Sequence, residues 1–258
     1  GAYPPGFGGR LSSVVNFSAR DARKDRVGVK ASGNLLSSKL LAEVPFSDNF
    51  RLLVNGRSSI SSDAYRKFLK TDIPLSFYDA FTRLTWEGDA SHTRVNLTTL
   101  FTDDVLKSSN PDEPDYGWKN KAAGISASSL LQDRLFVKVD IFSSTYEAQR
   151  TSKLSTATPA TTSVGEGGMR VNATVYGESD NLYNIGFEML FPTVESQLVN
   201  LQGASQRLLS HSVEGSAWFR VQSSWDDLKT DIGVHMDLAG VVNEGRGIES
   251  FEPRLSLS

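Results

Sequence analysis

The stretch Leu228–Leu238 reads Leu-Lys-Thr-Asp-Ile-Gly-Val-His-Met-Asp-Leu, and its apolar residues mostly occupy every second position. Successive side chains of a β-strand point to opposite faces, so Ile232, Val234 and Met236 share one face, and Asp231 and His235 share the other. The run has 11 residues, whereas a strand of a soluble protein usually has about 5 or 6. A tilted strand that crosses a bilayer needs about 9–11 residues. The stretch therefore predicts a membrane-crossing β-strand with one apolar face.

The same alternation recurs along the chain. It is clearest in 134–142, 169–176 and 213–222. The pattern predicts twelve strands, the last of them cut off, at 24–34, 37–46, 49–59, 77–88, 92–102, 116–130, 133–146, 168–178, 181–192, 211–223, 228–240 and 251–258.

The connections between these strands alternate between short and long. Short polar turns lie near Asp48, Asp89, Asp133, Asp180 and Asp226, which are 41 to 47 residues apart. The connections on the other side cover 59–76, 102–116, 147–167, 193–210 and 241–250, and only the first, near Asn34, is short. Short turns on one side and long loops on the other are typical of an up-and-down outer-membrane barrel. Short helical turns are expected within the long loops, at 64–70 and in 194–209.

The composition is compatible with such a barrel and excludes several other classes. The 258 residues carry a net charge of −3 and no cysteine, which excludes disulfides, thiolate zinc sites and cysteine nucleophiles. Lys and Arg do not form a basic block, so no nucleic-acid partner is expected. Hydrophobic residues make up 39%, which suffices for a barrel because only every second residue of a crossing must be apolar.

The first twenty residues do not fit the strand pattern. They contain Phe7-Gly-Gly-Arg-Leu-Ser-Ser-Val14, which resembles the end of the plug domain in TonB-dependent outer-membrane receptors, most closely the Bacteroidota type. Further similarity lies in Leu40–Phe46, Asn55–Ser59, Phe77–Asp79 and Glu252–Ser256, which resemble barrel strands of that family.

The resemblance implies a domain division and a function. Residues 1–22 would be the C-terminal end of a plug and 23–258 the N-terminal half of the barrel, with about 11–12 of the 22 strands expected in the family. The chain is then an internal fragment of a receptor that imports a bulky nutrient. The nutrient would be a siderophore, a vitamin, an oligosaccharide or a peptide, and the composition of the loops does not distinguish among these. The partners implied by the resemblance are TonB, outer-membrane lipids and, by family analogy, a surface lipoprotein, and the implied location is the bacterial outer membrane.

The resemblance places the plug–barrel junction at Gly8, Gly9 and Arg10. The two glycines suit positive φ angles or a close backbone approach beside the barrel wall, although an ordinary turn explains them equally simply. Arg10 is expected either to pair with a carboxylate of the inner barrel face or to be solvated.

Five residues on the polar faces of predicted strands are candidates for the barrel lumen. They are Arg170, Glu214, Trp218, Arg220 and Asp237. On this prediction they contact plug, water or substrate, and Trp218 is singled out as a plug or ligand contact.

One predicted loop is rich in carboxylates: Asp103, Asp104, Asp112, Glu113 and Asp115. Oxygen ligands suit Ca²⁺, but a solvated acidic loop is the more common explanation, so these are only weak candidates and no metal is predicted. Tyr116 and Trp118 follow this loop and are expected in an interfacial aromatic girdle rather than against a ligand, and Trp86 and Trp225 in the girdle at the opposite rim.

Two other functions compete with transport. A soluble all-β sandwich or propeller that binds carbohydrate or protein needs shorter strands and a packed core. An outer-membrane lipase needs Ser and His at one rim, but the adjacent pair His211-Ser212 points to opposite faces. No nucleophile elbow, P-loop or zinc motif is present, so no catalytic residue, no cofactor and no enzymatic activity are predicted.

Overall fold

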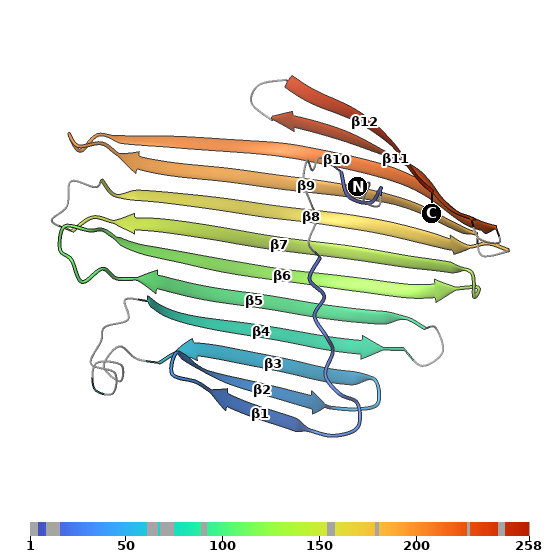
Figure 1. Ribbon diagram of the computed structural model, residues 1–258, viewed down its shortest axis with the longest axis horizontal. Helices are drawn as coiled ribbons and strands as arrows, with labels where there is room; N and C mark the ends of the chain where they lie inside the picture. Colours follow the sequence, from blue (N-terminus) through green and yellow to red (C-terminus); the bar gives the residue numbers. More distant parts are fainter. Residues whose placement is uncertain are drawn as a thin grey trace.

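The protein is a single antiparallel sheet of twelve strands that follow one another in chain order from β1 to β12 (Figure 1). The computed structural model describes residues 5–8, 16–60, 67, 75–88, 92–153, 158–178, 181–225, 228–241 and 246–257. Every strand pairs with its neighbours in sequence, so the topology is up-and-down, as the sequence predicts. Within the described residues no helix is long and apolar enough to cross a membrane.

The strands lengthen from β1 towards the middle of the sheet. Their bounds are β1 Gly28–Gly33, β2 Ser37–Pro45, β3 Phe50–Ser59, β4 Leu75–Glu87, β5 Arg94–Leu106, β6 Asp115–Leu131, β7 Leu135–Thr151, β8 Ala160–Tyr176, β9 Leu182–Val199, β10 Ser205–Trp225, β11 Leu228–Val241 and β12 Arg246–Leu257.

Strands β6 to β10 are longer than a bilayer requires. β10 has 21 residues, about 70 Å of extended chain, whereas a tilted crossing uses about 9–11 residues. The predicted strands are therefore too short on the side of the long loops. For example, β9 runs to Val199 and β10 begins at Ser205, and the ladder between them continues to the pair Ser205↔Val199. Hydrogen bonding to the neighbouring strand keeps these polar segments extended beyond the apolar band, so the predicted helical pattern in 194–209 is wrong. The other predicted helix, 64–70, lies outside the described residues except for Lys67.

The short turns near Asp48 and Asp133 lie where the sequence places them, whereas Asp89, Asp180 and Asp226 lie outside the described residues. β2 and β3 are joined by four residues, and β6 and β7 by three. In the latter turn Gln132 and Asp133 have φ angles of 52° and 57°, and the amide of Arg134 donates to the carbonyl of Leu131 at 3.3 Å. Two successive positive φ angles are the signature of a type I′ hairpin turn, which fits the natural twist of paired strands.

The two faces of the sheet differ in chemistry. The inner face is defined by the side chains of Glu43, Arg51, Thr85, Asn96, Arg170, Trp218 and His235, which the pairing register places on one side. On the outer face apolar side chains such as Ile141 and Ile185 are 57% and 58% exposed. Among the described residues only Ala22, Leu53 and Trp218 are buried hydrophobic residues. The sheet therefore has an apolar face turned outward and no conventional core.

The chain before β1 lies across the inner face. Figure 1 shows Pro5–Gly8 near β9–β11, and the described residues from Asn16 onward passing over the strands to the turn that enters β1. We refer to its described residues 5–8 and 16–24 as the N-terminal segment. Contacts at both of its ends, described next, hold it against the sheet.

Candidate functional site

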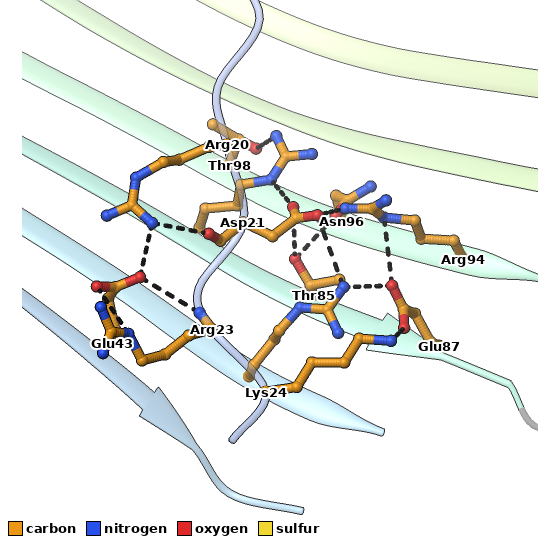
Figure 2. Close-up of polar contacts among 12 residues, drawn as sticks. Arg20, Asp21, Arg23, Lys24, Glu43, Thr85, Glu87, Arg94, Asn96 and Thr98 are labelled. Carbon is orange, nitrogen blue, oxygen red and sulfur yellow. Dashed lines mark hydrogen bonds and ion pairs between the residues drawn. The ribbon is translucent and has the colours of Figure 1, made fainter. Parts of the chain in front are cut away.

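The lower end of the N-terminal segment is held by an ionic cluster, which comprises Arg20, Asp21, Arg23 and Lys24 of the segment and Glu43, Arg51, Arg83, Glu87 and Arg94 of the sheet (Figure 2). These sheet residues come from β2, β3, β4 and β5. The alternation of the strands brings them to one face, because each occupies a position of the same parity in the ladder.

Asp21 is the centre of the cluster. Its carboxylate accepts a hydrogen bond of 2.8 Å from Nε of Arg83, forms an ion pair with Arg94 and lies 3.6 Å from Nη2 of Arg51. The hydroxyl of Thr85, which is fully buried, lies 3.3 Å from the same carboxylate and 2.9 Å from the side-chain oxygen of Asn96. One aspartate of the segment thus joins β3, β4 and β5.

Glu43 of β2 holds the neighbouring residues of the segment. Its side chain is 1% exposed, its Oε1 accepts a hydrogen bond of 2.6 Å from Arg20 and one of 3.3 Å from the backbone amide of Arg23, and its Oε2 lies 3.5 Å from Nε of Arg23. The hydrogen bond to Glu43 raises the pKa of Arg20. A buried carboxylate is tolerated only when it is paired, so Glu43 depends on the segment for its partners.

Glu87 closes the cluster at the end of β4. It accepts hydrogen bonds from Arg51 and from Nζ of Lys24, the latter at 2.5 Å. Arg51 is 4% exposed, and both its Nε and Nη1 lack a hydrogen-bond partner. Because a buried guanidinium without counter-charge is costly, Asp21 and Glu87 are both needed to stabilise Arg51.

The upper end of the segment, Pro5–Gly8, contacts a second site, which we call the tryptophan–histidine site. It comprises Asn184 and Gly186 of β9, Trp218 of β10, and Gly233, His235 and Asp237 of β11. Trp218 and His235 are 4% and 1% exposed, and their rings are nearly parallel, at 12° and with centroids 6.2 Å apart. The indole nitrogen of Trp218 donates to Oδ1 of Asn184 at 3.0 Å.

Glycines make this close packing possible. A Cβ on Gly186 would overlap the Trp218 ring, and a Cβ on Gly233 would overlap the ring of Pro5. On the segment side, a Cβ on Gly8 would overlap the imidazole of His235, and one on Gly6 would lie 3.4 Å from Trp218. The segment and the sheet therefore approach one another through Gly8, Gly186 and Gly233, where an added Cβ would overlap a neighbouring side chain.

The predicted junction residues are only partly placed. Gly8 lies against His235, which matches the close-approach interpretation of that glycine. Gly9 and Arg10 lie outside the described residues. Their role at the junction stays a prediction.

The structure places all five lumen candidates on the inner face. Arg170 forms a two-pronged hydrogen bond with Glu188, at 3.0 and 2.9 Å, and its guanidinium lies 5.8 Å from the ring centre of Phe7. Arg220 pairs with Asp231. Trp218 and Asp237 belong to the tryptophan–histidine site, and Glu214 lies half-buried on β10, nearer the long loops. The structure thus brings Trp218, Asp237 and Arg170 together at Pro5–Gly8, and leaves Glu214 and Arg220 apart.

The carboxylates at 103–115 do not gather at one point. In the part of the chain that the structure describes, no three His, Asp or Glu side chains are close enough to hold a metal ion. Asp103 lies 3.3 Å from Nζ of Lys119, Asp115 lies 2.6 Å from Nζ of Lys153, and Glu113 accepts a hydrogen bond from Ser108. Asp103 and Asp104 also belong to β5 rather than to a loop. Local pairing accounts for the charges of Asp103 and Asp115.

Of the two tryptophans predicted at the rim of the short turns, Trp86 is placed by the structure, and the side chain of Trp225 lies outside the described part of the chain. Trp86 lies on the outer face near the short turns, with its ring centre 6.5 Å from that of Phe50. The other rim differs. In the unbroken ladder of β5 and β6, Trp118 pairs with Asp104 and Tyr116 pairs with Leu106. Asp104 and Leu106 are an even number of residues from Asn96 on the same strand, so both pairs lie on the same face as Asn96. Trp118 and Tyr116 therefore lie on the inner face, where they face the lumen rather than lipid.

A polar cavity of about 890 Å³ separates part of the N-terminal segment from the sheet. Its walls include residues 16–21 of the segment and, from the sheet, Arg83, Arg94, Asn96, Lys138, Asp140, Arg170 and Glu188. The cavity connects the ionic cluster to the Arg170–Glu188 pair, so one continuous polar surface lines the inner face.

The sequence interpretation did not single out the ionic cluster. Glu43 is in a stretch that reads as apolar, Leu40–Phe46, and Asp21 is in a charged run that resembles a solvated linker. The sequence does contain one indication of the cluster. Glu43, Arg51 and Thr85 occupy alternating strand positions that the pairing places on the same face of the sheet.

Solved structures with the same fold are outer-membrane transporters and receptors. The chain superimposes on FpvAI in its complex with pyocin S2 with a TM-score of 0.69 and 9% identity, over 93% of this chain and 41% of that one. For the ferric citrate transporter FecA the TM-score is 0.66 with 12% identity, over 92% and 42% of the two chains. For the outer membrane transporter YddB from Escherichia coli the TM-score is 0.62 with 11% identity, over 85% of this chain and 35% of that one.

These comparisons establish the fold. The chain has the barrel fold of TonB-dependent outer-membrane receptors and spans well under half the length of these three structures. No family model and no curated protein matches the sequence. The structural neighbours are transport receptors and not enzymes, in agreement with the absence of a predicted activity.

Proposed function

We propose that this chain is part of a TonB-dependent receptor in the bacterial outer membrane, which captures a bulky nutrient and imports it. The observation that carries the proposal is the N-terminal segment, bound by ion pairs and glycine contacts to the polar inner face of an up-and-down sheet. A segment that crosses the lumen and is fastened to the wall fits a plug inside a barrel.

The domain division follows the same argument. Residues 1–22 are the end of the plug and 23–258 the first part of the barrel. This division is supported by the described contacts of Pro5–Gly8 and of Arg20–Lys24 with the inner face, which precede the start of β1 at Gly28. The neighbouring receptor barrels, of which this chain covers less than half, support a larger barrel for the whole protein. The likeness of residues 7–14 to the Bacteroidota type is part of this proposal.

The nutrient belongs to the bulky classes that such receptors take up. FecA is a ferric citrate transporter, and FpvA binds iron-loaded pyoverdines, so ferric complexes are the first candidates, and a vitamin, an oligosaccharide and a peptide are the others. Trp118 and Tyr116, on the inner face at the rim of the long loops, are placed to stack on such a ligand. TonB, lipids and a surface lipoprotein are the proposed partners.

A soluble binding module does not fit the same observations. A sandwich buries one face of each sheet in a common core, whereas here the apolar face carries Ile141 and Ile185 more than half exposed and the sheet has no second layer. An exposed apolar surface of this extent marks a lipid or protein contact.

The experiment uses the complete gene that encodes this chain. The protein is tagged and followed by density fractionation of envelopes, and uptake of radioactive iron as ferric citrate, of labelled cyanocobalamin and of a maltooligosaccharide is measured with and without TonB. TonB-dependent uptake of one probe and co-sedimentation with outer membranes are expected. Recovery in the soluble fraction, or uptake of none of the probes above the TonB-deficient level together with wild-type growth of a deletion strain on every bulky nutrient supplied, would overturn the proposal.

A further inference from the structure

The polar cavity has more positive than negative charge on its walls. Five of its wall residues are basic and three are acidic. They are Arg20, Arg83, Arg94, Lys138 and Arg170, and Asp21, Asp140 and Glu188. The chain as a whole carries a net charge of −3, so the cavity has the opposite sign to the protein around it. A concave surface with an excess of one sign of charge concentrates ions of the other sign, and this cavity therefore attracts anions.

At the end of the cavity away from the ionic cluster, two carboxylates and two basic groups compensate one another. Nζ of Lys138 donates to Asp140 at 2.9 Å, and Arg170 donates to both oxygens of Glu188, at 3.0 and 2.9 Å. The ammonium group of Lys138 has three donors, and its side chain is 44% exposed. Lys138 can therefore bind a second acceptor while it keeps its bond to Asp140.

At the end next to the ionic cluster, the basic groups outnumber their partners. Arg51, Arg83 and Arg94 all face the carboxylate of Asp21 (Figure 2). Nε of Arg94 is buried without a hydrogen-bond partner, and an oxygen of Glu87 lies 3.9 Å from it, too far for a hydrogen bond. Each guanidinium group has five donors, so donors remain for a further acceptor.

Small residues of β6 lie between the two ends of the cavity. Gly124, Ser126 and Ser128, which we call the β6 floor, are part of its wall. Ser128 pairs with Arg94 of β5 and with Lys138 of β7. Neighbouring strands are about 4.8 Å apart, so the Cα atoms of Arg94 and Lys138 are separated by about 10 Å. The β6 floor leaves this interval open for a ligand, and its two serine hydroxyl groups can donate hydrogen bonds to that ligand.

We propose that the cavity binds a small anion with two or more carboxylate or phosphate groups, which lies on the β6 floor between Arg94 and Lys138. Arg83 and Arg94 bind one end of the anion, because a planar guanidinium group matches two oxygens of a carboxylate or phosphate. Lys138 binds the other end as a point charge. A neutral or cationic ligand is not favoured, because arginine and lysine side chains offer no acceptor. The proposal rests on the wall residues and does not depend on the proposed transport function.

The test measures binding of citrate and of pyrophosphate to the full-length protein in detergent by isothermal titration calorimetry. Trimethyl citrate, which has the shape of citrate without its charges, is the neutral probe. We expect each anion to bind at one site, with an affinity that falls as salt screens the charges, and we expect trimethyl citrate not to bind. An assembled wild-type protein that binds neither anion, or that binds trimethyl citrate as tightly as citrate, would overturn the proposal.

The deciding variant is Ser128→Asp, which fixes a carboxylate on the β6 floor between Arg94 and Lys138. This carboxylate takes the donors that the anion needs, and the loss of one hydrogen bond to a charged group weakens binding about tenfold or more. Ala122→Asp is the matched control. It puts the same side chain on the same face of β6, about 20 Å from Ser128 and outside the cavity wall, and it should leave the affinity for citrate unchanged.

Lys138→Gln and Lys138→Arg provide a second comparison, which adds no carboxylate. The glutamine removes the charge and should weaken citrate binding about tenfold, whereas the arginine keeps the charge and should retain binding. The assembly of each variant is checked on gels with and without boiling. A citrate affinity that Ser128→Asp and Lys138→Gln both leave unchanged would show that the anion binds elsewhere, and the proposal would be wrong.

A second arm identifies the source of the anion, which is either free in the periplasm or a nutrient that carries carboxylate groups. TonB-dependent uptake of radioactive iron supplied as ferric citrate is measured for Ser128→Asp and Ala122→Asp. Uptake that is lost in Ser128→Asp but kept in Ala122→Asp identifies the nutrient as the source. Equal uptake in the two variants identifies an anion of the periplasm, and either result is compatible with the site defined by the binding measurement.

Discussion

Nε of Arg83 donates a 2.8 Å hydrogen bond to the Asp21 carboxylate, which joins the N-terminal segment to a strand 62 residues further along the chain. Arg83 and Asp21 are 17% and 20% exposed, so water screens the bond only weakly. With Arg51 and Arg94, this pair gives Asp21 three arginine partners, from three different strands.

The first prediction concerns Asp21→Asn. The amide keeps the size of the side chain but removes the charge that faces Arg51, Arg83 and Arg94. Loss of hydrogen bonds to charged groups costs about 1.5–3 kcal/mol, so the segment is expected to open more often. Tryptic cleavage after Arg20 and Lys24, followed by mass spectrometry of the assembled protein, measures this opening.

Asp25→Asn is the control for the first prediction. Asp25 belongs to the same stretch, but its side chain is 69% exposed and contacts only the exposed Arg26 among the ion pairs of the described residues. Exposed pairs contribute little, so its cleavage rate should equal that of the wild type. Equal rates for Asp21→Asn and Asp25→Asn would contradict a role for the ionic cluster.

The second prediction concerns Gly186→Ala. The new methyl group would overlap the Trp218 ring, and overpacking of this kind costs about 1–3 kcal/mol. Trp218 should leave its place and lose its contact with Pro5–Gly8. Fluorine NMR of the protein with trifluoromethylphenylalanine in place of Phe7 measures this, as a shift towards the resonance of the same label at Phe17, which is 91% exposed. Gly215→Ala on β10, where nothing lies within 4 Å of the new Cβ, should leave the spectrum as it is. An unshifted spectrum for Gly186→Ala would contradict the prediction, because it would show that the tryptophan–histidine site accommodates the added methyl group without moving Trp218.

The third prediction compares the two faces of the sheet. Ile141→Arg puts a charge on the outer face, where Ile141 is 57% exposed, and an arginine there costs about 2–4 kcal/mol at the bilayer midplane. Ser126→Arg puts the same side chain on the inner face beside the polar cavity, where it is expected to be tolerated. The yield of protein assembled in the outer membrane measures both. Similar yields would mean that the outer face does not contact lipid.

The fourth prediction separates the two tryptophans at opposite rims. Trp118→Ala removes an aromatic side chain from the inner face and should weaken nutrient binding by about 1 kcal/mol, roughly fivefold in affinity, with assembly unchanged. Trp86→Ala removes the partner of Phe50 on the outer face and should lower assembly yield without changing the affinity of the protein that assembles. Binding of the nutrient identified by the uptake experiment provides the measurement, and the reverse pattern would place Trp118 in the lipid girdle.

The fifth prediction concerns the 258-residue chain expressed alone. Its sheet ends at β1 and β12, each of which pairs on one side only within the described residues. A bilayer does not tolerate such edges, because the backbone groups there find no water. The isolated chain should therefore migrate identically on gels with and without boiling after incubation with detergent micelles. A heat-sensitive, faster-migrating form would show that the edges close on one another.

Most of the sheet could be predicted from alternation. The runs at 134–142, 169–176, 213–222 and 228–238 lie in β7, β8, β10 and β11 with the expected faces. Alternation depends on the difference between lipid and lumen, so it weakens where both faces meet water. For that reason the sequence pattern predicts loop and helix for the outer parts of β9 and β10, although backbone pairing between the two strands keeps these parts extended.

The contacts between residues were harder to predict than the faces. Parity places Trp218 and Asp237 on the inner face, but it does not say that His235 lies between them and Pro5, since that contact joins residues 230 positions apart. Equally, Trp118 was assigned to lipid because tryptophan is common at membrane interfaces, while its register with Asp104 places it on the other face. The prediction for Trp118 depends on residue type, but its position in the alternation of the strand determines the face on which it lies.

Only three hydrophobic side chains are buried among the described residues, and this determines where the energy for folding comes from. A soluble chain gains most of its stability by withdrawing apolar surface from water into its own interior. This sheet has almost no interior, so the apolar phase must be supplied by the membrane itself. In water alone the apolar outer face of the described strands has no partner in this sheet, so the sheet is expected to be stable only where lipid covers that face. Folding and insertion are therefore one event, and the lipid is as much a part of the folded structure as the backbone ladder.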